Sequence, residues 1–345
     1  MLSTVAPPAG TRRRLAGQVA VAAASLVVSL LALEAGLRLL DRYVMIYDIE
    51  MWKYAKYLKR QAADPAIGHE HVPNARARLD GVEVAINSHG LRDREYGHAK
   101  PPGTVRILVL GDSNTFGWGV PVEATYPKQL ERLLNEGEAG ARRYEVINAG
   151  VGNYNTTMEI AYLERHGLRY SPDVVIVGWF INDAEPTPRR VISPVLERSH
   201  LAALGLMSTR YFLTYLGLEP DYRRYYSELY EDGAPGWAAA RSALIRLGHL
   251  ARERTFTPII LLLPDLHLLQ AQYPFDAAHR KVSTLARSKD IALLDGLEVF
   301  RGMDGRTLWV SRTDAHMNAR AHALTARALF DFLRAQSLLP DRRAR

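Results

Sequence analysis

The sequence contains no cysteine among its 345 residues. That absence excludes disulfide bonds, thiolate metal sites and a cysteine nucleophile, although it does not identify the compartment. The sequence also has no phosphate-binding loop, no evident cluster of metal-ligating residues and no internal repeat or low-complexity tract. We therefore expect neither a metal ion nor an organic cofactor.

Acidic residues are fewer than basic ones, 37 against 44, and the formal net charge is +7. Part of the excess is terminal, in arginines at 12–14 and at 342, 343 and 345. There is no basic stripe interleaved with aromatic side chains and no nucleic-acid-binding motif, so nucleic acid is not an expected partner. The apolar fraction of 48% and charged fraction of 23% are typical of a globular protein with a full-sized core.

Charged side chains are also missing from residues 15–33, a run rich in Ala, Val and Leu. As a helix this run would be about 28 Å long, close to the thickness of a bilayer core. Three arginines and no acidic residue precede it, whereas charges of both signs follow it. The positive-inside bias predicts a single-pass anchor at 15–40 in the cytoplasmic (inner) membrane, with a cytoplasmic tail at 1–14 and the remainder periplasmic or extracellular.

Two other interpretations of this run stay open. A cleaved signal peptide needs small residues at alternate positions beyond the apolar run. Leu33 and Glu34 each break that pattern, and leucines continue at 37, 39 and 40. A buried core helix is the second alternative, but an uncharged run of this length at the extreme N-terminus favours the anchor.

Residues 41–103 are interpreted as a connector and lead-in, closed by the breaker sequence KPPG at 100–103. From 104 to 338, apolar runs of strand length alternate with helical stretches. The expected strands cover 105–110, 144–149, 173–180, 258–263 and 291–294. This pattern predicts a central parallel sheet with helices on both faces, a three-layer α/β/α fold. Residues 184–236, rich in Tyr, Arg and Pro, interrupt the alternation as an insertion near the site.

Three polar motifs adjoin the expected strands or the last helix: 111–114 (GDSN), 180–183 (FIND) and 314–318 (DAHMN). The carboxyl ends of parallel strands meet at one edge of the sheet, where sites form. A serine becomes a useful nucleophile when a base takes its proton, and histidine has a suitable pKa for that task. A carboxylate can orient the histidine ring, and an asparagine amide can donate to an oxyanion.

Each motif alone also has a purely structural interpretation. The first and last could cap helices, and the second could be an Asn-Asp turn at a strand end. In addition, Asp265 and His267 repeat the D-x-H spacing after another expected strand. His267 therefore competes with His316 for the role of base.

Taken together, the motifs and their order resemble the SGNH hydrolase family, also called GDSL esterases, over residues 104–335. The resemblance implies a flavodoxin-like SGNH fold, with Ser113 as nucleophile, His316 as base and Asp314 as the acid. The acid lies two residues before the base rather than the usual three, a spacing also found in related alginate-type acetyltransferases. Residues 87–93 (NSHGLRD) resemble the lead-in of membrane-anchored bacterial members.

The resemblance also implies an oxyanion hole. Residues 148–153 (NAGVGN) are similar to the family block that supplies a backbone amide. Here Asn153 stands in place of the usual glycine, so Gly152 is an alternative donor. The hole would combine the amides of Ser113 and Asn153 with the side chain of Asn182. The glycine of the third block is also replaced, by a phenylalanine at 180.

The implied chemistry is acyl transfer through an acyl-enzyme on Ser113. We expect a serine esterase that hydrolyses O-acyl esters, acetyl or short acyl, of envelope glycans or lipids. Two alternatives stay open: an O-acyltransferase that modifies an extracellular polysaccharide, and an inactive membrane-tethered scaffold. Tyrosines of the insertion could stack on a sugar or simply pack the insertion onto the domain; they are Tyr211, Tyr215, Tyr222, Tyr225, Tyr226 and Tyr230. No oligomeric state is predicted.

Overall fold

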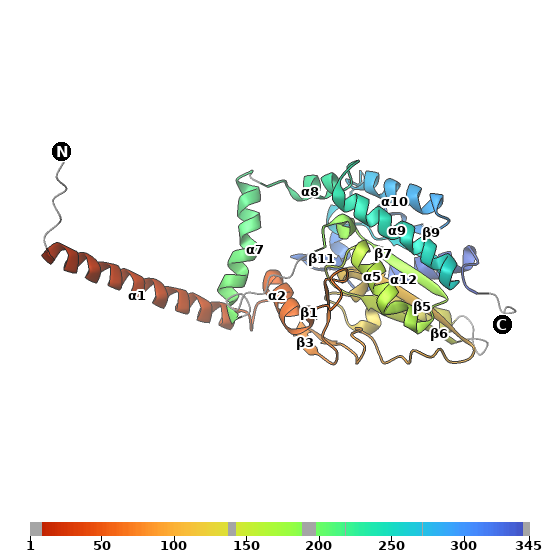
Figure 1. Cartoon of the computed structure of the whole chain (residues 1–345), viewed down its shortest axis with the longest axis horizontal. Helices are drawn as coiled ribbons and strands as arrows, with labels where there is room; N and C mark the ends of the chain where they lie inside the picture. Colours follow the sequence, from red (N-terminus) through yellow and green to blue (C-terminus); the bar gives the residue numbers. More distant parts are fainter. Residues whose placement is uncertain (1–8, 137–142, 188–197, 218, 271, 341–345) are drawn as a thin grey trace.

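The computed structural model describes residues 9–136, 143–187, 198–217, 219–270 and 272–340 (Figure 1). The start of the expected cytoplasmic tail, at 1–8, lies outside the described residues. So do positions 188–197 and 218 of the expected insertion and the C-terminal arginines.

A five-stranded parallel sheet forms the centre of the molecule, as predicted. Its spatial order is β6-β5-β7-β8-β9, so the chain starts inside the sheet and extends it first on one side and then on the other. The expected strands are all present, with ends shifted by about a residue. The strands are β5 (Thr104–Gly111), β6 (Arg143–Gly150), β7 (Val174–Trp179), β8 (Thr257–Leu262) and β9 (Ala292–Asp295).

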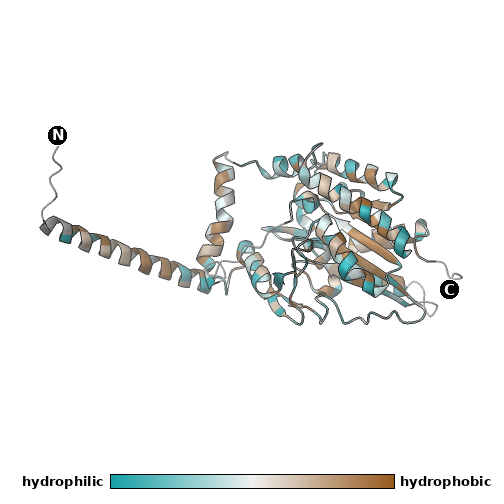
Figure 2. Cartoon of the chain, in the orientation of Figure 1, coloured by the Kyte–Doolittle hydropathy of each residue, from teal (hydrophilic) through white to brown (hydrophobic). Residues whose placement is uncertain are grey.

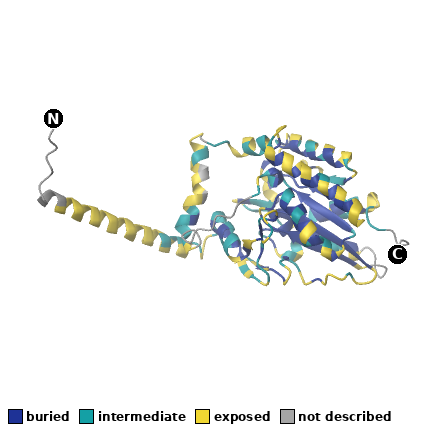
Figure 3. Cartoon of the chain, viewed as in Figure 1, coloured by how far each residue is buried: buried dark blue, intermediate teal, exposed yellow. Residues whose placement is uncertain are grey.

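Helices cover both faces of this sheet, which confirms the three-layer prediction. Leu108 and Leu110 of β5 face α5 (Thr156–Arg165), α9 (Pro235–Arg254) and α10 (Asp276–Ser288). The alternate residues Ile107 and Val109 face α4 (Tyr126–Glu136), α11 (Leu297–Phe300) and α12 (Ala319–Ala335). The inner strands β5 and β7, and nearly all of β6, are accordingly buried on both sides (Figure 3), whereas the edge strand β9 is half-buried. This two-sided burial explains why they appear in the sequence as continuous apolar runs.

The strand register aligns the GDSN motif, the NAGVGN block and the FIND motif, which lie at the ends of β5, β6 and β7. Gly111 pairs with Gly150 on one side and with Gly178 on the other. The segments that leave these strands therefore start at the same level of the sheet. They start where β6 and β7 lie on opposite sides of β5, which is the switch point at which open α/β sheets form their sites.

Residues 41–103 form more than a connector. They contain α2 (Tyr47–Tyr57) and two small hairpins, β1 (Lys59–Gln61) with β2 (His69–His71) and β3 (Arg76–Leu79) with β4 (Val82–Ala85). Tyr54 and Leu79 from this lead-in share a buried cluster with Phe116 and Trp118. The lead-in thus packs against the turn that follows Ser113.

Short elements complete the described chain. They are α3 (Ser113–Phe116), η1 (Val122–Ala124), η2 (Gly167–Tyr170), η3 (Ile181–Ala184), η4 (Leu266–Leu268), η5 (Gly305–Thr307), β10 (Trp309–Ser311) and β11 (Asp314–Met317). The last two strands pair as an antiparallel hairpin directly before α12. The insertion contributes α7 (His200–Tyr215) and α8 (Tyr222–Leu229).

The N-terminal helix α1 (Ala9–Leu40) extends away from the domain (Figure 1). Its stretch Arg13–Leu40 is long and apolar enough to cross a membrane, and the apolar window is not buried in the molecule. Figures 2 and 3 show the middle of the same helix as apolar and exposed. A buried core helix is therefore the wrong interpretation of this run. Its length and composition fit a membrane span or a signal sequence.

Candidate active site

Ser113 is the first residue of the short helix α3, immediately beyond β5. The side chain of Asp112 caps this helix by accepting a hydrogen bond from the backbone N–H of Asn114 at 2.8 Å. Asn148 donates from its side chain to the carbonyl of Thr115 at 2.8 Å, which fastens α3 to β6. Gly111 is required at the turn because any Cβ there would collide with the side chain of Thr115. The Ser113 side chain is thereby presented beyond the edge of the sheet.

His316 and Asp314 reach Ser113 from β11. Nε2 of His316 lies 2.8 Å from Oγ of Ser113, and Nδ1 lies 2.6 Å from Oδ1 of Asp314. Because an ionised carboxylate only accepts, Nδ1 carries the proton and Nε2 is free to accept from the serine hydroxyl. The indole N–H of Trp118 donates to the other carboxylate oxygen of Asp314 at 2.7 Å. The D-x-H spacing therefore brings Asp314, His316 and Ser113 into one chain of hydrogen bonds.

Burial and charge shift the pKa values of Asp314 and His316 in opposite directions. Burial alone would raise the pKa of Asp314, but hydrogen bonds from His316 and Trp118 and the charge of His316 lower it overall. Burial likewise works to lower the pKa of His316, yet the hydrogen bond and charge of Asp314, with the charge of Asp112, raise it overall. The histidine thus becomes a stronger base than an exposed imidazole.

The loop after β6 presents Asn153 to the site. Asn153 has a left-handed backbone with φ 63° and lines the pocket in front of Ser113. The backbone N–H of Gly152 is already engaged, since it donates to the hydroxyl of Tyr54 at 2.9 Å. Of the two amides that the sequence left open, the Asn153 N–H is thus the better placed to meet a bound group.

Side chains from the lead-in hold this loop. Nζ of Lys59 donates to the carbonyl of Gly152 at 2.5 Å and to Oδ1 of Asn153 at 3.1 Å. A ring nitrogen of His69 lies 3.0 Å from the same carbonyl, and Tyr54 bonds the neighbouring N–H. Three residues that come before β5 in the sequence therefore determine the shape of the loop after β6.

Asn182 lies at the start of the turn η3, on the opposite side of Ser113. Its Nδ2 donates to Oδ2 of Asp112 at 3.2 Å, and the side chain lines the pocket. The amide group has two N–H bonds, so one remains for a ligand. Within the described part of the chain, its Oδ1 is buried without a hydrogen-bond partner.

His267, the competing histidine, is placed at the wall of the same pocket. Its ring packs against Trp309 at a centroid distance of 5.4 Å, and its backbone N–H donates to Asp265. The carboxylate of Asp265 in turn accepts from the hydroxyl of Tyr222 at 2.6 Å. His316 is the histidine within hydrogen-bonding distance of the Ser113 hydroxyl.

A pocket of about 560 Å³ opens in front of Ser113 and His316. Its apolar walls come from the lead-in, the end of β7, the insertion and the β10–β11 hairpin: Tyr47, Met51, Phe180, Tyr222, Tyr226 and Trp309. Some tyrosines of the insertion lie where they could contact a substrate, and others pack the insertion onto the domain. Tyr222 and Tyr226 line the pocket, whereas Tyr230 is buried and donates to the carbonyl of Ile181. Tyr215 is 85% exposed, and the side chain of Tyr211 lies outside the described residues.

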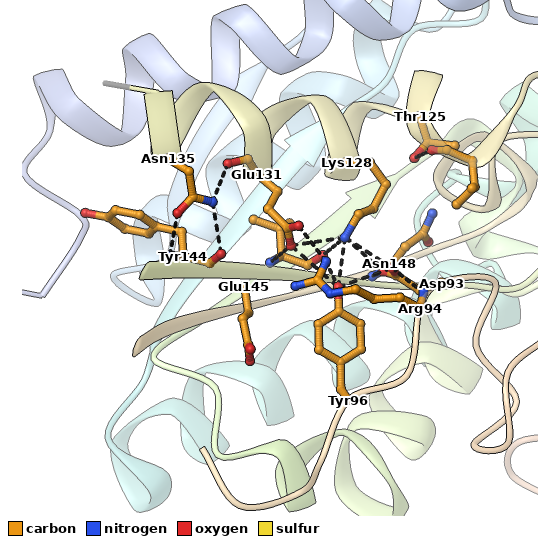
Figure 4. A network of polar contacts seen from close by, with 12 residues as sticks. Asp93, Arg94, Tyr96, Thr125, Lys128, Glu131, Asn135, Tyr144, Glu145 and Asn148 are labelled. Atoms are coloured by element: carbon orange, nitrogen blue, oxygen red, sulfur yellow. Dashed lines mark hydrogen bonds and ion pairs between the residues drawn. The ribbon is translucent and has the colours of Figure 1, made fainter. Parts of the chain in front are cut away.

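The NSHGLRD segment at 87–93 attaches the lead-in to the edge of the sheet where Ser113 lies. Arg92 is almost fully buried and donates to the carbonyls of Gly117 and Val120 beyond α3. Asp93 accepts from the backbone N–H of Asn148 at 2.9 Å and joins a polar network through Lys128 (Figure 4). The segment therefore holds the loop that follows the GDSN motif and the first residue of the 148–153 block.

Sequence reasoning missed Trp118, Tyr54, Lys59 and His69 as neighbours of the site. Trp118 carried a partial signal, because it lies in the loop that follows the GDSN motif. The other three lie more than forty residues before Ser113, and only their tertiary contacts relate them to it.

The sequence profile of the GDSL-like lipase/acylhydrolase family matches residues 109–324. The chain belongs to this family. The resemblance to SGNH or GDSL enzymes is thereby confirmed. Ser113, Asn182 and His316 lie within the matched residues, whereas the lead-in precedes them.

Individual proteins similar to this chain share only a low sequence identity with it. An arylesterase from Vibrio mimicus is 26% identical over 132 residues, which are 38% of this chain and 64% of that protein. The chain thus spans less than two thirds of this curated relative. The crystal structure of TesA has 17% identity and a TM-score of 0.44, covering 67% of this chain and 98% of that one. Axe2, an acetylxylan esterase from Geobacillus stearothermophilus, has 16% identity and a TM-score of 0.44, covering 66% and 94%.

Proposed function

We propose that this protein is a serine esterase with Ser113 as nucleophile, His316 as general base and Asp314 as the orienting acid. The observation that carries the proposal is the continuous chain of hydrogen bonds from Ser113 Oγ through the His316 ring to Asp314. As Oγ attacks the ester carbonyl carbon, Nε2 takes its proton and returns it to the departing alkoxide. Water then attacks the acyl-enzyme, with His316 taking its proton and giving it back to Ser113.

Three donors would stabilise the negative oxygen that forms in each step. They are the backbone amides of Ser113 and Asn153 and the side-chain amide of Asn182, with Gly152 as the alternative backbone donor. Gly152 is the weaker candidate because Tyr54 already occupies its N–H. Donors of this kind typically contribute about 3 kcal/mol each to the transition state.

The substrates we propose are O-acyl esters, acetyl or short acyl, of envelope glycans or lipids. In this proposal α1 is an uncleaved single-pass anchor in the inner membrane, and the catalytic domain is periplasmic or extracellular. The chain would then divide into a tail (1–14), an anchor (15–40), a lead-in (41–103) and a hydrolase domain (104–338) with an insertion at 184–236. The exposed apolar surface of α1 and the arginines at 12–14, which precede its uncharged run, support this arrangement.

Ser113→Ala tests the proposal directly. The full-length variant in detergent should lose hydrolysis of short-chain aryl esters and lose the mass increase that a serine-directed phosphonate adds to the wild type. Ser242→Ala, at an exposed position on α9, is the matched control and should retain both. Undiminished activity in Ser113→Ala would remove the nucleophile assignment. A wild type that neither hydrolyses nor takes up the probe would favour the inactive scaffold.

An O-acyltransferase is the second candidate, and the position of Tyr222 and Tyr226 at the pocket wall favours it. Aromatic faces there could hold a sugar acceptor whose hydroxyl replaces water. The assay supplies an acyl donor with and without a glycan acceptor and follows both products. We expect free acid to form at the same rate in both mixtures. Accumulation of acylated glycan with free acid at background would replace the esterase with a transferase.

A further inference from the structure

The insertion helix α7 exposes an apolar surface beside the end of α1. Leu206, Phe212, Tyr215 and Leu216 are 61%, 60%, 85% and 51% exposed. The helix sequence has one arginine and no acidic residue. Figure 2 shows apolar turns along α7, separated by more polar ones, and Figure 1 shows the helix running steeply across the domain end of α1. Exposed apolar residues concentrated on one short helix are unusual on a monomeric soluble protein.

Glu34 joins the two helices. Its carboxylate accepts hydrogen bonds from the Ser199 hydroxyl at 2.8 Å and from the backbone N–H groups of His200 and Leu201 at 3.1 and 2.9 Å. These are groups at the N-terminus of α7, where a negative charge is favourable. Glu34 is also the first charged residue after the uncharged run 15–33. The start of α7 is therefore fixed at the level where α1 first carries charge.

The opposite side of α7 is fixed by its packing against α2. Ala203 is buried in a cluster with Ile49 and Trp52 of α2. Phe212 comes nine residues later, which at about 100° per residue places it half a turn around the helix from Ala203. Leu216 lies on the same outer side. One side of α7 thus faces the domain, and Phe212, Tyr215 and Leu216 point away from it.

We propose that α7 is an interfacial helix that docks through Phe212, Tyr215 and Leu216 onto the surface of the bilayer crossed by α1. The proposal rests on α1 as a membrane anchor in the proposed function. Glu34 places the start of α7 at the membrane surface, and the steep crossing of the two helices lays α7 along that surface. An amphipathic helix in this position buries its apolar side at the boundary between headgroups and acyl chains.

Docking would also hold the catalytic pocket beside the membrane. The helix α2 contacts α7 through Trp52, whose ring lies 4.9 Å from that of His200. The same helix lines the pocket with Tyr47 and Met51. One helix therefore separates the docking side from the site, which suits esters presented at the bilayer surface.

Site-directed spin labelling tests this placement, since the absence of cysteine makes every introduced cysteine unique. Phe212→Cys and Leu216→Cys are labelled with a nitroxide in the full-length protein. The labelled proteins are then reconstituted into vesicles of phosphatidylethanolamine and phosphatidylglycerol. Collision rates are measured with oxygen, which concentrates in the bilayer, and with a water-soluble nickel chelate. Val27→Cys in α1 and the exposed Ser242→Cys on α9 provide the membrane and water references.

We expect the labels at 212 and 216 to lose nickel accessibility and keep oxygen accessibility, like the label at 27. High accessibility to both reagents, as at 242, would place α7 in water and overturn the docking. Low accessibility to both would mean that protein covers this side, for example a second copy of the chain, and would also overturn it. A label at 27 outside the bilayer would contradict the anchor itself. Aryl-ester hydrolysis by the same labelled proteins in detergent reports on the esterase proposal separately.

Discussion

The indole N–H of Trp118 donates a 2.7 Å hydrogen bond to the carboxylate of Asp314. His316 occupies one oxygen of that carboxylate and Trp118 the other. With both oxygens engaged, the carboxylate has a single orientation, and so does the imidazole that it holds. Trp118 lies just beyond α3, the short helix that begins with Ser113, so one segment supports both ends of the hydrogen-bonded chain.

Trp118→Phe should therefore lower kcat while leaving the nucleophile in place. The phenyl ring keeps much of the packing but removes the donor. A hydrogen bond to a charged group contributes about 1.5–3 kcal/mol, which corresponds to a loss of roughly tenfold or more. Steady-state kinetics should show the loss in kcat rather than KM. Trp237→Phe on α9 removes an indole away from the pocket and should keep kcat; equal losses in both variants would contradict a specific role.

The pH profile should report the His316–Asp314 pair. The base must be neutral to accept a proton, so kcat/KM should rise with pH as His316 loses its own. Because Asp314 raises the pKa of His316, the midpoint should lie above the ordinary value of about 6.5. Asp314→Asn removes that negative charge and should move the midpoint to lower pH, with a rate loss of about 10³–10⁴-fold. Phosphonate labelling rates measured across pH can follow both changes; an unmoved midpoint would contradict the assignment.

Lys59→Met, a substitution in the lead-in, should impair the proposed oxyanion hole. The substitution removes both hydrogen bonds to the loop at 152–153 while retaining much of the side-chain volume. A loosened donor loses part of its contribution of about 3 kcal/mol, so we expect kcat to fall about tenfold with a smaller change in KM. Arg60→Met, at the neighbouring exposed position paired with Glu70, is the control and should stay near wild type. Unchanged kcat in Lys59→Met would show that the loop holds its shape alone.

Glu159 on α5 should make the protein less stable as pH rises. Both its carboxyl oxygens are buried without a hydrogen-bond partner in the described part of the chain. Burial, with the charges of Asp183 and Asp112, raises its pKa well above the usual value. The folded protein therefore keeps a proton that the unfolded chain releases above pH of about 4.3, and each further pH unit costs about 1.4 kcal/mol until the folded pKa is reached.

Thermal unfolding at pH 5 and pH 8 measures this effect. Glu159→Gln cannot ionise, so its Tm should exceed that of the wild type by more at pH 8 than at pH 5. Glu164→Gln, at an exposed position on the same helix, should show no such widening. A difference between Glu159→Gln and wild type that is the same at both pH values would mean that Glu159 does not titrate as proposed.

The sequence determined the sheet and the order of the motifs along its edge. Strands such as 105–110 are predictable because burial on both faces leaves a continuous apolar run, which survives in the sequence without any partner being known. The positions of Ser113 and Asn182 follow directly, since each comes a few residues after such a strand. The uncharged run at 15–33 is equally local, because the length of a helix follows from its number of residues.

Only the tertiary structure decided which histidine meets Ser113 and what holds the loop at 152–153. His316 and His267 have the same local D-x-H pattern, and the β10–β11 hairpin brings one of them to the serine. Lys59 reaches Gly152 across a sequence separation of 93 residues. Contacts of this kind form when separate elements pack together. They therefore cannot be predicted from the periodicity of the sequence or from the spacing of residues along it. Periodicity in the sequence indicates which side of a helix or strand is buried. Which other element packs against that side is known only from the folded structure.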